Sequence, residues 1–123
     1  MVKTNKLEEV LTSLDIPQVA QEIYIQLLGS KSLTARMLAE LVNIPRPSVY
    51  DQIRLLQQKN LIISKKQDGK TFFIANDPNT IQVLLDQRKE QFEKAKKVFA
   101  DILPSLQAGD KTVEPKIQFF NGV

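Results

Sequence analysis

A segment near residue 50 carries polar side chains whose types and spacing suit contacts with nucleic acid. Val49, Ile53 and Leu56 are spaced as the buried face of a helix over residues 46–59. The opposite face of that helix presents Arg46, Ser48, Tyr50, Asp51 and Arg54. Arginine can pair with guanine through two hydrogen bonds, serine and tyrosine can donate to phosphate, and aspartate can accept from cytosine. This face is therefore a candidate DNA-binding surface.

A second basic cluster lies on a predicted β-hairpin. Residues 61–66 and 70–75 are rich in β-branched and aromatic side chains, as strands are. Asp68-Gly69 between them is typical of a type I′ turn, which needs two positive φ angles. Lys65, Lys66 and Lys70 stand near this turn, where they could reach a phosphate or the minor groove.

The distribution of charge supports this interpretation. The whole chain has a net charge of only +3, but residues 30–75 hold eight basic and three acidic side chains, a net charge of +5. Thr34 is a predicted N-cap within this segment, and Arg36 follows it in the first turn of a helix. The backbone N–H groups of such a turn can bind a phosphate oxygen. The positive charge is thus concentrated where a DNA backbone would favour it.

Several of these residues have a purely structural alternative. Tyr50 could fill the edge of the core, and Asp51 could face solvent or pair with Arg54 instead of reading a base. Lys65 and Lys66 could protect an edge strand against aggregation, since charged edges do so without DNA.

The order of predicted elements places these residues on one fold. Helices are expected over residues 7–14, 17–28 and 34–42, with Ala20, Ile23, Leu27 and Leu28 on the buried stripe of the second. A tight break at residues 43–45 precedes the helix over residues 46–59, and the hairpin follows. Three helices with a short turn before the last, then a hairpin, predict a mainly α (α+β) winged helix-turn-helix domain over residues 1–78.

A long helix is expected next, from residues 77–80 to about Leu103, where Pro104 stops or kinks it. Its apolar residues alternate in steps of four and three, which is a coiled-coil seam over residues 79–106. The seam comprises Ile81, Leu85, Arg88, Phe92, Ala95, Phe99, Ile102 and Leu106. We expect homodimerisation through it, although a helix packed on its own domain would show a similar stripe. Residues 107–123 are expected to be a linker and a strand at Lys116–Phe120.

The composition argues against several other classes of protein. The 123 residues include no cysteine and no histidine, which removes disulfides, thiolate chemistry and the commonest general base. No nucleophile–base pair, metal-ligand cluster or phosphate-binding glycine loop can be assembled, so we expect neither an enzyme nor a cofactor. No apolar run approaches a membrane span, and the first ten residues lack a signal sequence. A cytoplasmic protein is expected.

The segment from Ile16 to Ala75 resembles the N-terminal domain of TrmB-type transcriptional regulators. The matching stretches are IYIQLL at 23–28, the run LTARMLAELVNIPRPSVYDQIRLLQQKNLI at 33–62, and FFIANDP at 72–78. Within them, I-P-R-x-S-V-Y-D at 44–51 is the most specific. EPKIQFFNG at 114–122 is similar to the first strand of the effector domain in such proteins. Asn60 departs from the family, which usually has glycine before the wing, but asparagine tolerates the left-handed conformation.

The resemblance implies a DNA-binding transcriptional regulator that acts as a homodimer on operator DNA. It also implies a small-molecule effector that is sensed only through a C-terminal domain, which this sequence does not include beyond its first strand. A different class of function remains open. The same helix-turn-helix surface could instead dock on another protein without binding DNA, and salt-sensitive binding to duplex DNA distinguishes the two.

Overall fold

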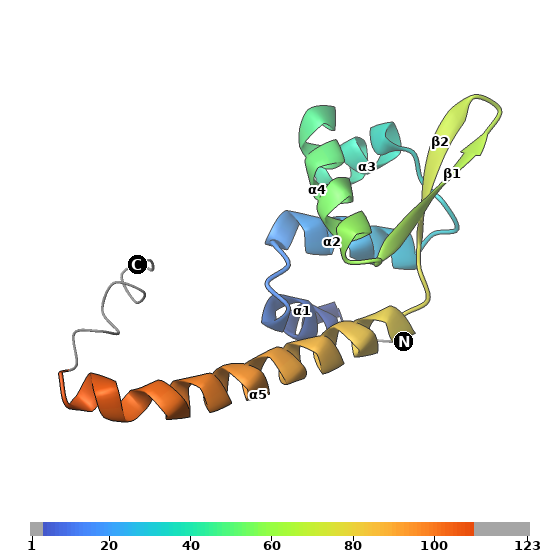
Figure 1. The fold of residues 1–123 in the computed structure, drawn as a ribbon. Helices are drawn as coiled ribbons and strands as arrows, with labels where there is room; N and C mark the ends of the chain where they lie inside the picture. Colours follow the sequence, from blue (N-terminus) through green and yellow to red (C-terminus); the bar gives the residue numbers. More distant parts are fainter. Residues whose placement is uncertain (1–3, 110–123) are drawn as a thin grey trace. The chain divides into compact units, whose positions relative to one another are not determined.

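A computed structural model describes residues 4–109 of the chain, and the predicted strand at 116–120 lies outside them. The elements in chain order are α1 (Thr4–Ser13), α2 (Gln18–Leu28), α3 (Ala35–Val42), α4 (Arg46–Gln58), β1 (Ile62–Gln67), β2 (Lys70–Ala75) and α5 (Asn79–Gln107) (Figure 1). The chain forms two compact units, residues 1–85 and residues 86–123. This element order confirms the predicted winged helix-turn-helix with a long C-terminal helix.

Helix α2 lies at the centre of the first unit, where it contacts α1, α3, α4 and β2. Its apolar stripe meets those of the neighbouring helices, as expected for amphipathic helices around one core. The buried apolar residues of this core are Leu11, Leu14, Ile16, Ala20, Ile23, Tyr24, Leu27, Ala35, Leu38, Val49, Ile53, Leu56, Leu61, Ile62 and Phe73. Every helix from α1 to α4 and both strands contribute to it.

Two positions on α2 differ from the predicted stripe. Leu28 was expected to be buried and is exposed, whereas Tyr24, which the stripe omitted, is fully buried. Direction from the helix axis is not the reason, because Gln21 is buried and points only about 20° away from Leu28. Leu28 is the last residue of α2, so its position along the helix places it beyond the packed part of that face. Gln21 is also buried, and its Nε2 donates to the carbonyl oxygen of Ile16 at 2.8 Å.

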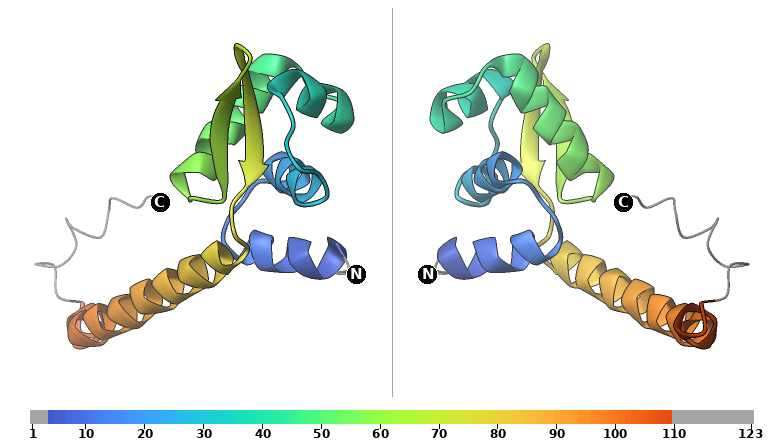
Figure 2. Two further views of the ribbon diagram at one scale, coloured as in Figure 1. Left: turned by 90° about the vertical axis from the view of Figure 1, so that its right-hand side faces the viewer. Right: turned by 90° about the vertical axis from the view of Figure 1, so that its left-hand side faces the viewer.

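The predicted hairpin is present as a two-stranded antiparallel sheet. Ile62 pairs with Ala75 at its base, and Gln67 pairs with Lys70 at its tip. Asp68 and Gly69 between them have φ angles of 53° and 76°, the two positive values of the expected type I′ turn. Figure 2 shows the hairpin extending beyond the helices of this unit. We call β1, β2 and their turn the wing.

A third segment pairs with the wing. The backbone N–H of Leu33 donates to the carbonyl oxygen of Phe73 at 3.1 Å, and that of Phe73 donates back at 2.8 Å. Phe73 is also buried in the core. Leu33 lies between α2 and α3 in the sequence, so its pairing with Phe73 ties the start of α3 to the middle of β2.

Helix α5 differs from its prediction at its C-terminal end. We expected Pro104 to stop or kink the helix, and the expected stop is wrong, because the helix continues through Pro104 to Gln107. A proline removes one helical N–H donor, but its carbonyl oxygen still accepts, and the N–H of Ala108 donates to the carbonyl oxygen of Pro104 at 3.0 Å just after the helix ends. At the N-terminal end, Asp77 Oδ1 accepts from the N–H of Asn79 at 2.8 Å. No helix in the described residues is both long and apolar enough to span a membrane.

The phenol of Tyr24 is an unusual feature of this core. Its side chain is fully buried, and its hydroxyl has no hydrogen-bond partner among residues 4–109. Burial and, secondly, the negative charge of Asp77 raise the pKa of this phenol above the ordinary value of tyrosine. The folded state therefore disfavours the phenolate. Below the ordinary tyrosine pKa the ionisation of this group costs the folded state no stability. The free energy of unfolding falls as the pH rises from that value towards the raised pKa of Tyr24.

We therefore expect Tyr24→Phe to leave the free energy of unfolding at neutral pH unchanged, or to raise it by up to about 1 kcal/mol, because it removes an unpaired buried hydroxyl. Above pH about 10 the wild type should lose stability that the variant retains. Urea unfolding followed by circular dichroism at both pH values measures this. Tyr50→Phe is the matched control, since Tyr50 is exposed. An identical pH response in wild type and Tyr24→Phe would contradict the expectation.

Candidate nucleic-acid interface

The turn between α3 and α4 spans only three residues and depends on one left-handed residue. Asn43 has φ 57° and ψ 52°, and its N–H donates to the carbonyl oxygen of Ala39. The N–H of Ile44 donates to the same carbonyl oxygen at 3.1 Å. Pro45 then precedes α4, with Pro47 in the first turn, where helical N–H groups have no intrahelical acceptor. This turn directs α4 away from α3.

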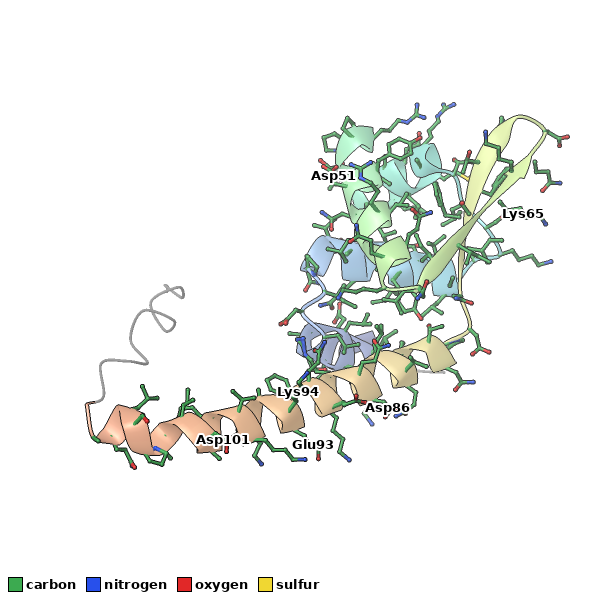
Figure 3. The ribbon with its side chains drawn as sticks, viewed as in Figure 1. Asp51, Lys65, Asp86, Glu93, Lys94 and Asp101 are labelled. Carbon is green, nitrogen blue, oxygen red and sulfur yellow. The ribbon has the colours of Figure 1, made fainter. Side chains whose placement is uncertain are left out.

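Helix α4 presents the predicted polar face to solvent. Val49, Ile53 and Leu56 are buried, as the spacing predicted. On the other side Arg46, Tyr50, Asp51 and Arg54 are exposed and Ser48 is half-buried. Tyr50 is 40% exposed, so it does not fill the core edge. In Figure 3, Asp51 lies on the side of α4 that faces away from the wing.

The wing presents its lysines to solvent. All residues of β1 beyond Ile62 are exposed, which includes Lys65 and Lys66, and Lys70 at the start of β2 is exposed as well. Figure 3 shows Lys65 on the wing, well separated from Asp51 on α4. Lys65 and Lys66 therefore add positive charge to the projecting hairpin.

The start of α3, the start of α4 and the wing enclose a groove of about 570 Å³, which we call the wing groove. It brings together predicted residues that are far apart in the sequence: Thr34, Arg36, Arg46, Tyr50 and Lys70. Ser48, Asp51, Arg54, Lys65 and Lys66 do not line it. The groove is open to solvent at the surface where positive side chains gather.

Six residues that line the wing groove were not among the predicted DNA-binding residues: Ala35, Met37, Glu40, Gly69, Thr71 and Phe72. Met37 and Phe72 supply apolar surface, and Glu40 supplies a carboxylate. Met37 is 44% exposed although it belongs to a helix whose opposite face is core. Met37 faces away from the buried Ala35 and Leu38 of α3, but nothing in the sequence showed that β2 would lie across from it.

Thr34 has a defined structural role at the groove. It is the N-cap of α3, and its Oγ1 accepts a hydrogen bond from the N–H of Met37 at 3.2 Å. This confirms the predicted cap. The hydroxyl oxygen therefore serves the helix, and its hydrogen remains available for an acceptor in the groove.

Two ion pairs involve predicted residues. Arg36 Nε lies 3.9 Å from Glu40 Oε2, at the limit of a salt bridge, with both side chains largely exposed. Arg54 Nη2 donates a hydrogen bond to Asp51 Oδ1 on the outer face of α4. Within residues 4–109, no carboxylate lies at ion-pair distance from Arg46, Lys65, Lys66 or Lys70.

The predicted seam residues on α5 differ in exposure. Ile81 and Leu85 are half-buried and pack against the core of the first unit. In the second unit, Phe92 is 61% and Phe99 51% exposed. The guanidinium of Arg88 lies over the Phe92 ring, 5.7 Å from its centre, at cation–π distance. The charged residues Glu93, Lys94 and Asp101 follow along the same helix (Figure 3).

Comparison with known proteins agrees with this geometry. Residues 6–79 match the family described as sugar-specific transcriptional regulator TrmB. The chain is 24% identical over 120 residues to the DNA-binding HTH-type transcriptional repressor TrmBL2 of Thermococcus kodakarensis, which covers 94% of this chain and 46% of the repressor. The chain thus spans about half the length of this curated relative.

Solved structures share the fold. The structure of TrmBL2, described as an archaeal chromatin protein with a novel mode of DNA binding, superimposes with a TM-score of 0.67 at 17% identity. The match covers 96% of this chain and 43% of that one. The complex of Staphylococcus aureus MepR with DNA gives a TM-score of 0.54 at 22% identity, covering 83% and 90% of the two chains.

Helices α3 and α4 with their short turn, followed by the wing, define a winged helix-turn-helix domain. The family match covers this domain entirely and ends at the first residue of α5. The chain belongs to the TrmB family of transcriptional regulators.

The left-handed turn residue offers a test of how α4 is positioned. We expect Asn43→Ala to lower the free energy of unfolding by about 1 kcal/mol, because alanine is strained in this conformation. Asn43→Gly should be close to neutral, since glycine adopts it without strain. Urea unfolding curves of the two variants measure the difference. Equal losses for both would mean that the asparagine side chain, not its backbone conformation, is what stabilises the turn.

Proposed function

We propose that this chain is the DNA-binding part of a transcriptional regulator and that it binds duplex DNA as a homodimer. In this proposal α4 enters the major groove, and the wing contacts the adjacent backbone. Arg46 and Arg54 contact base edges or phosphates from α4, while the wing lysines contact phosphates. The protein acts by binding and not by catalysis, which its family relationship to transcriptional regulators supports.

The wing groove is the observation that carries the proposal. Three separate elements converge there, and each brings a cation: Arg36 from α3, Arg46 from α4 and Lys70 from β2. Only Glu40 opposes them within the groove. Such a concentration of positive charge around a concave surface attracts a polyanion. The apolar surface of Met37, Tyr50 and Phe72 between the cations suits the sugar rings of a DNA backbone.

Binding as a dimer follows from the exposed aromatic residues of α5. Phe92 and Phe99 lie one heptad apart, and burying each side chain is worth about 1.5–3 kcal/mol. A second copy of the helix would cover both rings in each protomer. The guanidinium of Arg88 lies over the Phe92 ring, so the charged member of the seam is placed against an aromatic face.

The first test concerns phosphate contacts. The logarithm of the DNA association constant should fall with the logarithm of salt concentration by about 0.9 for each phosphate contacted. Changing Lys65, Lys66 and Lys70 together to glutamine should reduce this slope by about 0.9 for each lysine that contacts a phosphate. Titration of a labelled duplex at several salt concentrations gives the slopes.

Lys6→Gln is the matched control for charge. Lys6 is exposed on α1, which lies at the opposite end of the domain from the wing tip (Figures 1 and 2). Its replacement should leave the slope unchanged. Absence of duplex binding by the wild type at low salt, with retention of a protein partner, would instead support a winged-helix protein-interaction module.

The second test concerns the dimer. The double variant Phe92→Glu, Phe99→Glu should be monomeric while the winged-helix unit stays folded, because two charges replace the largest apolar groups of the seam. Sedimentation equilibrium and circular dichroism measure the two properties. Val83→Glu is the control, since Val83 is exposed and lies off the seam. A wild-type monomer at micromolar concentration, or a double variant that stays dimeric, would refute pairing through this seam.

A further inference from the structure

Arg54 donates a hydrogen bond to a carboxylate, whereas Arg36, the other predicted DNA-binding cation with an ion pair, lies only at the limit of a salt bridge with Glu40. Arg54 Nη2 donates to Asp51 Oδ1, one helical turn earlier on α4. Both side chains are largely exposed, 64% for Arg54 and 65% for Asp51, so the pair stands on the surface of the helix and not in the core. The pair therefore does not serve to bury either charge.

The contrast with Arg46 and the wing lysines is electrostatic. Those cations have no carboxylate at ion-pair distance within residues 4–109, so they keep a full positive charge for phosphate. Asp51 cancels the charge of Arg54 locally and would itself repel a phosphate. Affinity for phosphate depends on net charge, whereas base reading depends on the direction of individual N–H groups. The neutral pair therefore loses affinity for phosphate but keeps the directed N–H groups that can read a base.

The remaining hydrogen-bond donors of Arg54 suit a base edge. A guanidinium has five N–H groups in a rigid planar fork, and the bond to Asp51 uses one of them. The others can still donate in parallel to the O6 and N7 atoms of guanine. A fixed fork loses less side-chain entropy on binding than a free arginine does.

We propose that Asp51 is a positioning residue that holds the Arg54 guanidinium for a guanine edge and prevents Arg54 from binding phosphate indiscriminately. This inference rests on the proposed DNA binding and adds to it the source of sequence selectivity. In this proposal Asp51 acts through Arg54, whose Nη2 donates to its Oδ1, and does not itself read cytosine.

The test compares two association constants for the full chain. One is for a duplex that the wild type selects from a random pool, and the other is for random duplex of the same length. Asp51→Ala should raise affinity for random duplex about twofold to fivefold, because a negative charge near phosphate is lost. The ratio of selected to random affinity should fall about tenfold, within the range set by one base contact.

Two variants separate positioning from charge. Glu40→Ala removes the same charge from the looser pair with Arg36, and it should raise both affinities without changing their ratio. Asp51→Asn keeps an oxygen that can accept a hydrogen bond from Arg54. This variant should therefore retain part of the selected-to-random ratio that Asp51→Ala loses. Circular dichroism confirms that each variant is folded.

A double variant decides between positioning and direct reading. In an Arg54→Ala background, Asp51→Ala should not lower the ratio further, because there is no guanidinium left to position. A further loss in that background would show that Asp51 reads a base directly and would overturn the inference. An unchanged ratio in Asp51→Ala would also overturn the inference, and so would a wild type that binds duplex without selecting any sequence. In both cases the proposed DNA binding would still stand. A wild type that binds no duplex would refute the proposed function as well.

Discussion

The backbone pairing between Leu33 and Phe73 is the constraint on which the proposed binding surface depends. A two-stranded hairpin alone is marginal in water, and this wing projects lysines that add nothing to its stability. The two hydrogen bonds to Leu33, together with the buried Phe73 side chain, anchor β2 beside the start of α3. Because of that anchor, Lys70 and Phe72 lie across from Arg36 and Met37 and form one groove with them.

Left-handed residues set the directions in which the chain leaves α3, α4 and β1. Asn43 turns the chain from α3 into α4, Asn60 lies between α4 and β1, and Asp68 with Gly69 reverses the wing. Asparagine, aspartate and glycine adopt this conformation at lower cost than other residues. The polar side chains of α4 are therefore aimed by a few short turns, and these turns are supported by a core in which α2 is central.

The cations on the proposed DNA surface divide into two kinds. Arg46 and the wing lysines have no nearby carboxylate among the described residues, so their charge is available to any phosphate. Arg54 is hydrogen-bonded to Asp51, which leaves its other N–H groups available while the two side chains together carry no net charge. One surface thus combines general attraction for a polyanion with a single directional contact. The exposed phenyl rings of α5 add a separate apolar surface that suits a second copy of the chain.

Local signals in the sequence were enough to predict the elements and their order, because periodicity, caps and turn residues act over a few positions. Thr34 as N-cap, the Asp68-Gly69 turn and the face of Val49, Ile53 and Leu56 all follow from such signals. The Leu33 bridge, the burial of Tyr24 and the wing groove depend on contacts between distant segments. Helical spacing also placed Leu28 inside, since spacing does not show how far along a helix the packing extends. Pro104 predicted an end of α5 near Leu103, since a single sequence does not show whether a proline is tolerated. The residue types on the binding face were therefore determined by the sequence. The meeting of Thr34, Arg36, Arg46, Tyr50 and Lys70 in one groove was decided by the tertiary structure, because only the packing of α3, α4 and β2 brings those distant residues together.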